Sequence, residues 1–446
     1  MNQKTLIAIA SLVILLIVGV GAYFYFTKKP ASTLPTSTTF PGEGRPSTGF
    51  PATGTGGETG GGDAPAPGSS SVLPRLYELH KLPVAGVGFA ETGRSPNRTI
   101  SARYIERGLG HIFETPLETL AESRIVNETR SRIMEALWGN NGKSVVIRFV
   151  DEKEGGAIIK ASILNLGGVS TSFARGTSTS PMSDFIKTEE VFLPDYIPFM
   201  ATAEDGGDKL FYLENGVGVS RGSIATFKGL GVSTIFNSAF TEWLPQFPNQ
   251  QLVTLTTKPS ATVPGHLFFV DLKTKSVTKI LGGRNGLTTL TSRNGKLTLF
   301  AEIKNGVPEL SFYDVTKKVS HPLYLQTLPE KCVWGVKNTT LAYCAVPQTI
   351  PSATYPDQWY QGLVTFSDSM WEIDTTTFNT RKILVPSNLG APALDIINLA
   401  LSSNDAYLLF MNKVTGTPWV YTIAEPLLPK AEVSPSAITP DMQKLR

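Results

Sequence analysis

The sequence predicts an all-β fold built from repeats of short strands. After the N-terminus, segments with helical periodicity are scarce, whereas Thr, Val, Phe, Tyr and Gly are plentiful. Within Thr291–Lys318, the pairs Asn294-Gly295 and Asn305-Gly306 each precede an alternating apolar run. Asn-Gly between such runs is a strong hairpin signal, because both residues tolerate the positive φ that tight turns need. Similar units lie on both sides of this segment, which favours a repeated architecture.

The N-terminus carries a candidate membrane segment. Leu6–Phe26 is uncharged and almost wholly apolar, and as a helix it is long enough to cross a bilayer core of about 30 Å. Lys4 and Lys28-Lys29 flank it on both sides, so the charges do not fix its orientation. Residues 1–29 are therefore predicted to be a cytoplasmic tip and a transmembrane signal anchor. The alternative is a signal peptide cleaved near the small residues Val20-Gly21-Ala22.

The segments that follow divide the rest of the chain into three parts. Residues 30–71 are almost entirely Pro, Gly, Ser, Thr and Ala, a composition that predicts a disordered linker. Residues 72–425 contain the repeats, and residues 426–446 lack any apolar period and are predicted to be a disordered tail. With the anchor, this order predicts a bacterial single-pass membrane protein whose folded body lies on the extracytoplasmic side.

A turn of Asn, Asp or Gly residues precedes the second strand of each unit and gives the repeat length. These second strands begin at positions 145, 210, 252, 297, 341 and 407, so the central intervals are 42, 45 and 44 residues and the outer ones are 65 and 66. A period in the low forties with four short strands is typical of a β-propeller blade. We expect blades at about 83–128, 130–192, 195–240, 243–284, 287–328, 331–386 and 394–423.

The last of these units has only three plausible strands, Ile396–Leu401, Tyr407–Met411 and Trp419–Ile423. The segment Val72–Leu79 can supply the fourth strand, which would close the ring and remove an exposed sheet edge. The expected architecture is therefore a seven-bladed propeller closed by an N-terminal strand. Six or eight blades remain open, because the first two units are the least regular.

The repeats resemble the TolB-type, WD-like propeller family over roughly residues 76–423. The resemblance rests on short apolar strands, a polar turn after the first strand, and third strands that end in Phe269-Val270-Asp271, Phe312-Tyr313-Asp314 and Glu372-Ile373-Asp374. It implies association with the cell envelope and protein partners. The Trp-Asp and Gly-His pairs of true WD repeats are absent, so a eukaryotic signalling scaffold is not expected.

The two cysteines, Cys332 and Cys344, flank a turn near Asn338. Pairing across this turn places them opposite each other on antiparallel strands, with Cβ atoms about 4.5–5.5 Å apart and near disulfide reach. A disulfide fits an oxidising compartment. The alternative is a pair of small buried thiols.

Two blades contain insertions, and the one in the sixth blade is the candidate binding loop. Leu166–Phe185 lengthens the second blade, and Val346–Gly362 separates the second and third strands of the sixth. The latter carries Tyr355, Asp357, Trp359 and Tyr360. Aromatic residues of this kind often anchor binding interfaces. The alternative is that they fold back and plug the ring.

No catalytic constellation emerges from the sequence. Gly218-Val219-Ser220-Arg221-Gly222 matches the nucleophile elbow G-x-S-x-G, but that motif needs a strand–turn–helix, and the residues after it read as a strand. The four histidines lack metal-ligand spacing. We therefore expect no catalytic, cofactor or metal site.

The charge balance also limits the class of partner. With 40 basic against 37 acidic residues, the chain lacks the clustered positive charge of a nucleic-acid-binding surface. The predicted function is a membrane-anchored binding or scaffold module of the cell envelope, with a protein or glycan partner. The alternative is a carbohydrate- or peptide-active enzyme that uses the central funnel.

Overall fold

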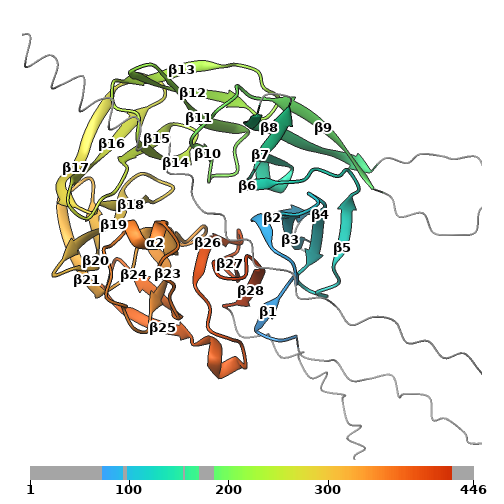
Figure 1. Cartoon of the computed structure of the whole chain (residues 1–446). Coiled ribbons are helices and arrows are strands. Elements are labelled where there is room, and N and C mark those ends of the chain that lie inside the picture. The colour runs from blue at the N-terminus through green and yellow to red at the C-terminus, as the bar shows by residue number, and fades with distance from the viewer. Residues whose placement is uncertain (1–72, 94–97, 154–155, 170–184, 424–446) are drawn as a thin grey trace, which may run out of the picture. The chain divides into compact units, whose positions relative to one another are not determined.

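The folded body is a ring of seven antiparallel sheets, each with four strands (Figure 1). The structure is a computed structural model that describes residues 73–93, 98–153, 156–169 and 185–423. The predicted all-β fold and the predicted seven blades are therefore confirmed. The proposed linker and tail lie outside the described residues.

In the first six blades the strands pair in the order in which they occur in the chain. The strands of these blades are β2 (Val84–Thr92), β3 (Thr99–Glu106), β4 (Ile112–Pro116) and β5 (Ser123–Val126); β6 (Ile133–Gly139), β7 (Ser144–Lys153), β8 (Gly156–Val169) and β9 (Ile186–Phe192); β10 (Met200–Thr202), β11 (Lys209–Gly216), β12 (Val219–Thr226) and β13 (Ser233–Ser238); β14 (Trp243–Asn249), β15 (Leu252–Thr257), β16 (Pro264–Asp271) and β17 (Val277–Asn285); β18 (Thr288–Thr291), β19 (Leu297–Lys304), β20 (Val307–Asp314) and β21 (Val319–Leu325); β22 (Cys332–Trp334), β23 (Leu341–Pro347), β24 (Asp368–Asp374) and β25 (Thr380–Leu384). The helical turns are η1 (Asn140–Gly142), η2 (Pro329–Lys331), α2 (Asp357–Tyr360) and η3 (Pro386–Leu389).

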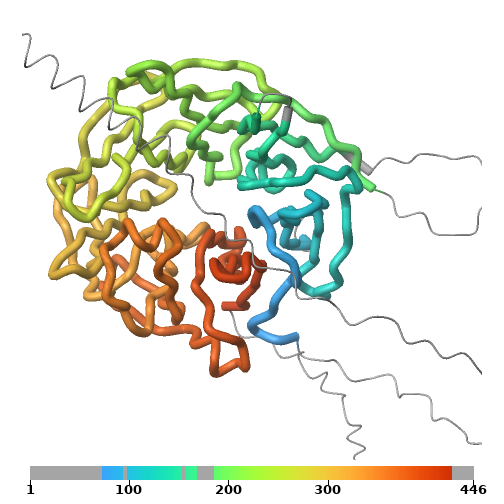
Figure 2. Tube along the Cα trace, in the orientation of Figure 1, coloured from blue at the N-terminus to red at the C-terminus, as the bar shows by residue number. Residues whose placement is uncertain are grey.

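The seventh blade joins the two ends of the described chain. It consists of β26 (Ile396–Leu401), β27 (Tyr407–Asn412), β28 (Pro418–Thr422) and, at its outer edge, β1 (Leu76–Glu78). β1 pairs antiparallel with β28, so that the first and last strands lie side by side (Figure 2). Closure by an N-terminal strand is therefore confirmed, and it covers the edge that β28 would otherwise expose.

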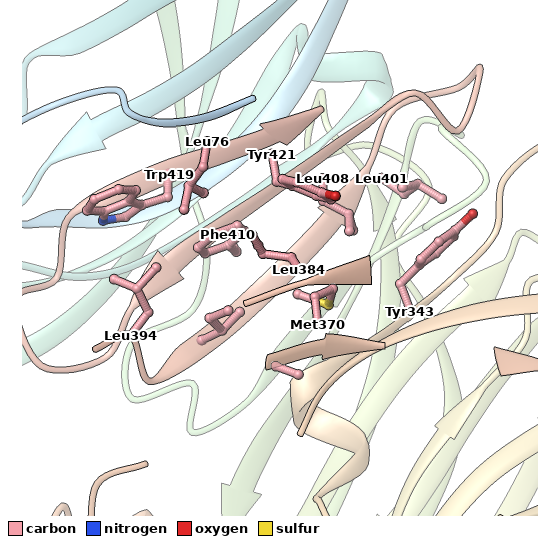
Figure 3. Packing of buried hydrophobic residues seen from close by; sticks show 12 residues of the cluster. Leu76, Tyr343, Met370, Leu384, Leu394, Leu401, Leu408, Phe410, Trp419 and Tyr421 are labelled. Atoms are coloured by element: carbon pink, nitrogen blue, oxygen red, sulfur yellow. The ribbon is translucent and has the colours of Figure 1, made fainter. Parts of the chain in front are cut away.

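Eight apolar clusters form the core of the described residues. Seven of them lie one between each pair of neighbouring blades, and the eighth contains the aromatic residues of the sixth-blade insertion. Side chains alternate between the two faces of a strand, so the second strand of each blade packs against both neighbours. In β27, Leu408 and Phe410 face the sixth blade (Figure 3), whereas Leu409 and Met411 face the first. Each blade therefore buries one face against the blade before it and the other face against the blade after it. In an open array the two end blades would each expose an apolar face, which a closed ring avoids.

The blade topology sorts the loops onto two faces of the ring. The turns from first to second strand and from third to fourth strand lie on one face, here called the turn face. The loops from second to third strand and the connections between blades lie on the other, here called the connector face. The insertion of the sixth blade separates β23 from β24, as predicted, and therefore lies on the connector face.

Polar side chains on the turn face link each blade to the next. The clearest link is Asp405, whose carboxylate accepts hydrogen bonds from the backbone N–H groups of Val336, Lys337 and Asn338 in the sixth blade. Other links of this kind join Glu91 to the Ser403 N–H, Asp205 to the Gln250 N–H, and the Asn249 amide to the Arg293 carbonyl. The Asn/Asp-rich turns that set the repeat length therefore also connect the blades.

The predicted single-pass membrane localisation is not supported by the structure. Within the described ranges, no helix is long enough and apolar enough to cross a membrane. The segment Leu6–Phe26, on which the prediction rested, lies outside these ranges.

Candidate functional site

The innermost strands enclose a cavity of about 530 Å³ along the ring axis. Every blade contributes to it, through β2, β6, β10, β14, β22 and β26 and through Arg293, which follows β18. Turn residues such as Asn141, Asp205 and Ser403 line it as well, so one end of the cavity lies at the turn face. A cavity of this size, formed by rigid strands, lies in the range of ordinary ligand sites.

The wall of the cavity combines polar and apolar side chains in similar amounts. The apolar ones include Phe89, Leu137, Trp138 and Leu399. β2 and β6 approach each other closely here, since a Cβ on Gly88 would lie only 2.4 Å from the Cβ of Trp138. This close approach requires glycine in β2 and fixes the indole at the cavity wall.

Four charged residues lie among this lining: Glu91, Glu204, Asp205 and Arg293. Two of the three carboxylates are already used in structural contacts. Asp205 accepts the N–H groups of Gly207 and Gln250, and Glu91 accepts that of Ser403 and pairs with Arg98. Glu204 is left as the carboxylate available to a ligand.

The environment of Glu204 changes its protonation. Burial raises its pKa to about 7, because an apolar surrounding disfavours the charged form. Nearby Arg293 opposes this shift, and neighbouring Asp205 adds to it. A carboxyl group that titrates near neutral pH inside a cavity is typical of functional sites. The sequence alone does not indicate this site, since Glu204 stands in a turn and has no local motif.

The predicted binding loop packs mostly inward. Tyr355 is 1% exposed and Trp359 is 5% exposed, and both pack with Phe366, Leu328 and Ala301. This position corresponds to the alternative in which the aromatics fold back onto the ring. Whether the loop binds a ligand stays a prediction, and the two buried aromatics offer little surface for it.

The remaining two residues of the loop connect it to other blades. Asp357 accepts a hydrogen bond from the Ala261 N–H of the fourth blade at 2.8 Å. The Tyr360 hydroxyl donates to Glu330, in the connection between the fifth and sixth blades. Tyr360 is nonetheless 41% exposed, so it is the loop aromatic with the most free surface. The insertion thus ties three blades together on the connector face.

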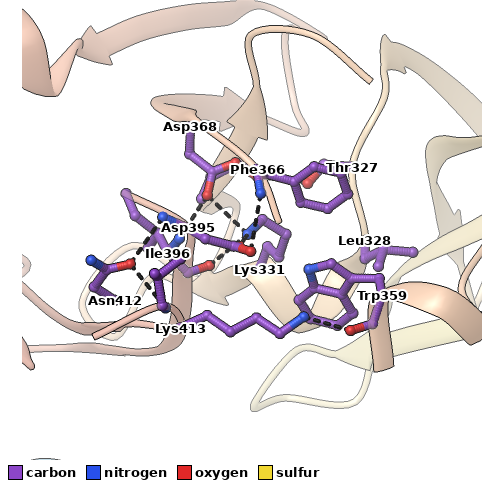
Figure 4. Close-up of polar contacts among 12 residues, drawn as sticks. Thr327, Leu328, Lys331, Trp359, Phe366, Asp368, Asp395, Ile396, Asn412 and Lys413 are labelled. Atoms are coloured by element: carbon purple, nitrogen blue, oxygen red, sulfur yellow. Dashed lines mark hydrogen bonds and ion pairs between the residues drawn. The ribbon is translucent and has the colours of Figure 1, made fainter. Parts of the chain in front are cut away.

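A buried charged cluster lies beneath this insertion (Figure 4). Lys331, Asp368 and Asp395 are each 0% exposed, and the Lys331 Nζ lies 2.8 Å from Asp368 Oδ2 and 2.5 Å from Asp395 Oδ1. The three residues come from a blade connection, the start of β24 and the residue before β26. Because they are far apart in the chain, no sequence motif could have indicated this cluster.

The predicted disulfide between Cys332 and Cys344 is present. The two residues are direct partners in the pairing of β22 with β23, as the turn near Asn338 predicted. Both are buried in the interface between the fifth and sixth blades. The alternative of two free thiols is therefore wrong.

The sequence match to a nucleophile elbow lies almost entirely within a β-strand. Ser220 lies within β12, in a strand that continues beyond Gly222, so the G-x-S-x-G match has no strand–turn–helix context. Within the described ranges, no group of three His, Cys, Asp or Glu residues is placed to hold a metal ion.

No family model matches this sequence, and a comparison with curated proteins finds no relative. Solved structures resemble the fold. TolB from Acinetobacter baumannii is 8% identical with a TM-score of 0.39, over 66% of this chain and 78% of TolB. An oligogalacturonate lyase in complex with manganese is 8% identical with a TM-score of 0.45, over 77% of this chain and 98% of the lyase. An oligogalacturonate lyase from Vibrio parahaemolyticus is 11% identical with a TM-score of 0.46, over 78% of this chain and 99% of the lyase.

The seven four-stranded blades agree with the predicted TolB-type propeller resemblance at the level of architecture. Identities of 8–11% indicate nothing about activity. One propeller fold hosts many functions, so the function has to be argued from the site.

Proposed function

We propose that this protein is a binding propeller that holds a peptide segment in its central cavity at the turn face. The observation that carries the proposal is the cavity itself, which combines apolar side chains from several blades with polar and acidic groups. Ligand sites typically combine apolar side chains with a few polar groups that fix the orientation of the ligand.

The charges of the lining favour a basic group on the ligand. Three carboxylates and one guanidinium line the cavity, so its formal charge is negative when all are ionised. An ionised Glu204 in an apolar surrounding attracts an amine or guanidine more strongly than a carboxylate in water does. A lysine or arginine side chain, or the amino terminus of a peptide, fits this requirement.

A binding function is favoured over hydrolysis because the described cavity provides one free carboxylate. Glycoside hydrolysis usually needs two carboxyl groups that flank the scissile bond. Here Asp205 and Glu91 are engaged by backbone N–H groups. Glu204, with a pKa of about 7, could act as a single acid or base. A direct assay of turnover tests the enzymatic alternative.

The test measures binding of defined peptides by isothermal titration calorimetry. The probes are tri-lysine and tri-alanine with blocked termini, together with a neutral oligosaccharide. We expect tri-lysine to bind, and Glu204→Gln to weaken it by roughly tenfold, which corresponds to about 1.4 kcal/mol for loss of one charge contact. Glu189→Gln on the exposed outer strand β9 is the matched control and should change nothing.

Two outcomes contradict the proposal. If tri-lysine does not bind, or binds equally well to the Glu204→Gln variant, the cavity is not the site of a basic ligand. If only the oligosaccharide binds, the ligand is a glycan, and the peptide proposal is wrong.

A further inference from the structure

The buried cluster of Lys331, Asp368 and Asp395 has a chemistry that the cavity does not use. Two carboxylates face one ammonium group in a site that water does not reach, since all three residues are 0% exposed. The Lys331 Nζ also donates to the Ile396 carbonyl at 2.9 Å. Three acceptors therefore hold one amine in a fixed position beside two carboxyl groups.

The walls of this site are aromatic and apolar. The Lys331 Nζ lies 5.5 Å from the ring centre of Trp359 and 5.2 Å from that of Phe366. Both rings lie beside the Lys331 side chain in Figure 4. Burial in this surrounding raises the pKa of Asp368 to about 6, although Lys331 opposes the shift. Ionised groups are costly in such a site, even when they are paired.

One oxygen of the cluster has no partner. Asp368 Oδ2 accepts from the Ile396 N–H at 2.6 Å and from Lys331, whereas Asp368 Oδ1 is buried with no hydrogen bond among the described residues. An unpaired buried polar oxygen destabilises the folded state, because it has lost its hydrogen bonds to water without replacing them. A reaction that removed this oxygen would relieve that penalty.

We propose that Lys331 and Asp368 condense to an intramolecular amide bond in the folded protein, with Asp395 as the proton-transfer group. Asp395 Oδ1, 2.5 Å from Nζ, takes a proton from the ammonium group. The neutral amine then attacks Cγ of the protonated Asp368 carboxyl group. The Ile396 N–H, already on Oδ2, stabilises the negative charge that develops on that oxygen.

The step balances without a further reactant. The bond formed is Nζ–Cγ, and the bond broken is Cγ–Oδ1. Oδ1 leaves as water with the carboxyl proton and one proton of the amine, the amide nitrogen keeps one proton, and Asp395 keeps the proton that it took from the ammonium group. The rigid site holds the reacting groups together, which replaces the entropy loss of a bimolecular encounter.

The product satisfies the polar groups better than the ion pairs do. The amide oxygen, formerly Oδ2, keeps the Ile396 N–H, and the amide N–H can donate to Asp395. Asp395 Oδ2 keeps the Phe366 N–H at 3.1 Å. The orphan Oδ1 is gone, and two formal charges have left the apolar site.

The test is the intact mass of the full chain after denaturation and reduction. We expect the wild-type protein to be lighter than its sequence by one water molecule. Lys331→Arg keeps the positive charge but cannot form the amide, and Asp395→Asn removes the proton acceptor, so both should have the full sequence mass. Lys413→Arg is the matched control, because Lys413 contacts Trp359 beside the cluster without taking part, and this variant should still lack one water.

Peptide mapping locates the bond. Reduction and alkylation come first, since Cys332–Cys344 links the same region. We expect trypsin not to cleave after Lys331 and a branched peptide to join Lys331 to Asp368. A wild-type chain of full sequence mass overturns the proposal, whether or not the variants fold. Loss of water without a branch, or a branch to Asp395, overturns it as well.

Discussion

Asp405 is expected to be one of the most important surface residues for the stability of the ring. Its carboxylate accepts the N–H groups of Val336 at 2.8 Å, of Lys337 at 3.1 Å and of Asn338 at 2.9 Å. All three belong to the sixth blade, whereas Asp405 belongs to the seventh. Replacing Asp405 by Ala therefore breaks a contact between blades and leaves three backbone donors to water.

The size of the effect follows from these bonds. A hydrogen bond to a charged group contributes about 1.5–3 kcal/mol when it is buried. Because Asp405 is half-buried and Lys337 and Asn338 are exposed, about 1 kcal/mol for each donor is more appropriate. Asp405→Ala should then lower the free energy of unfolding by about 3 kcal/mol. Asp405→Asn keeps one acceptor oxygen and should lose about half of that.

Urea unfolding followed by tryptophan fluorescence measures this loss. The matched control is Asp374→Ala, since Asp374 accepts the N–H and hydroxyl groups of Thr376 and Thr377 within its own turn. Hydrogen bonds between residues two or three apart also form in the unfolded chain, so we expect the control to lower the free energy of unfolding by only about 1 kcal/mol. If Asp405→Ala is no more destabilising than Asp374→Ala, contacts between turns do not hold the ring closed, and the reasoning is refuted.

Three further predictions follow from the structure. The double variant Cys332→Ala/Cys344→Ala should lower the free energy of unfolding by about 2–3 kcal/mol, because it lacks the disulfide. A reductant should lower the urea midpoint of the wild-type protein but leave the midpoint of the double variant unchanged. Trp359→Ala should lower the free energy of unfolding by about 3–5 kcal/mol, because the indole is buried. Tyr360→Phe should lower it by less than about 1 kcal/mol, because that ring is half-exposed. Equal losses in the two variants would contradict this packing. Binding of tri-lysine should strengthen as the pH rises from 6 to 8, because Glu204, with a pKa of about 7, gains its charge in this range, and calorimetry of Glu204→Gln should show no such rise.

The strand pattern could be predicted because it depends on local signals. β26 spans Ile396–Leu401, as predicted, since the alternating run ends at the Asn404-Asp405 turn. The pairing of Cys332 with Cys344 followed in the same way from the turn between them. Turn chemistry and a period of two act over a few residues and can be read directly from a single sequence.

The candidate sites could not be predicted, because they depend on residues far apart in the chain. Lys331 lies 64 residues before Asp395, its partner in the buried cluster. Glu204 becomes unusual only when the inner strands of several blades surround it. The orientation of Trp359 depends on Phe366 and Leu328 from neighbouring segments, so the loop sequence fitted an exposed anchor and a buried plug equally well.

The closure of the seventh blade has a consequence for synthesis of the chain. Arg75 and Tyr421, which meet beside β1 and β28, are 346 residues apart. β1 leaves the ribosome before any other described strand and finds its partner only after all the others have emerged. Until then the strands of the six earlier blades can pair with one another, while the backbone N–H and C=O groups of β1 can bond only to water. The first described strand to be synthesised is thus the last to pair. The ring can close only after the whole propeller has been translated.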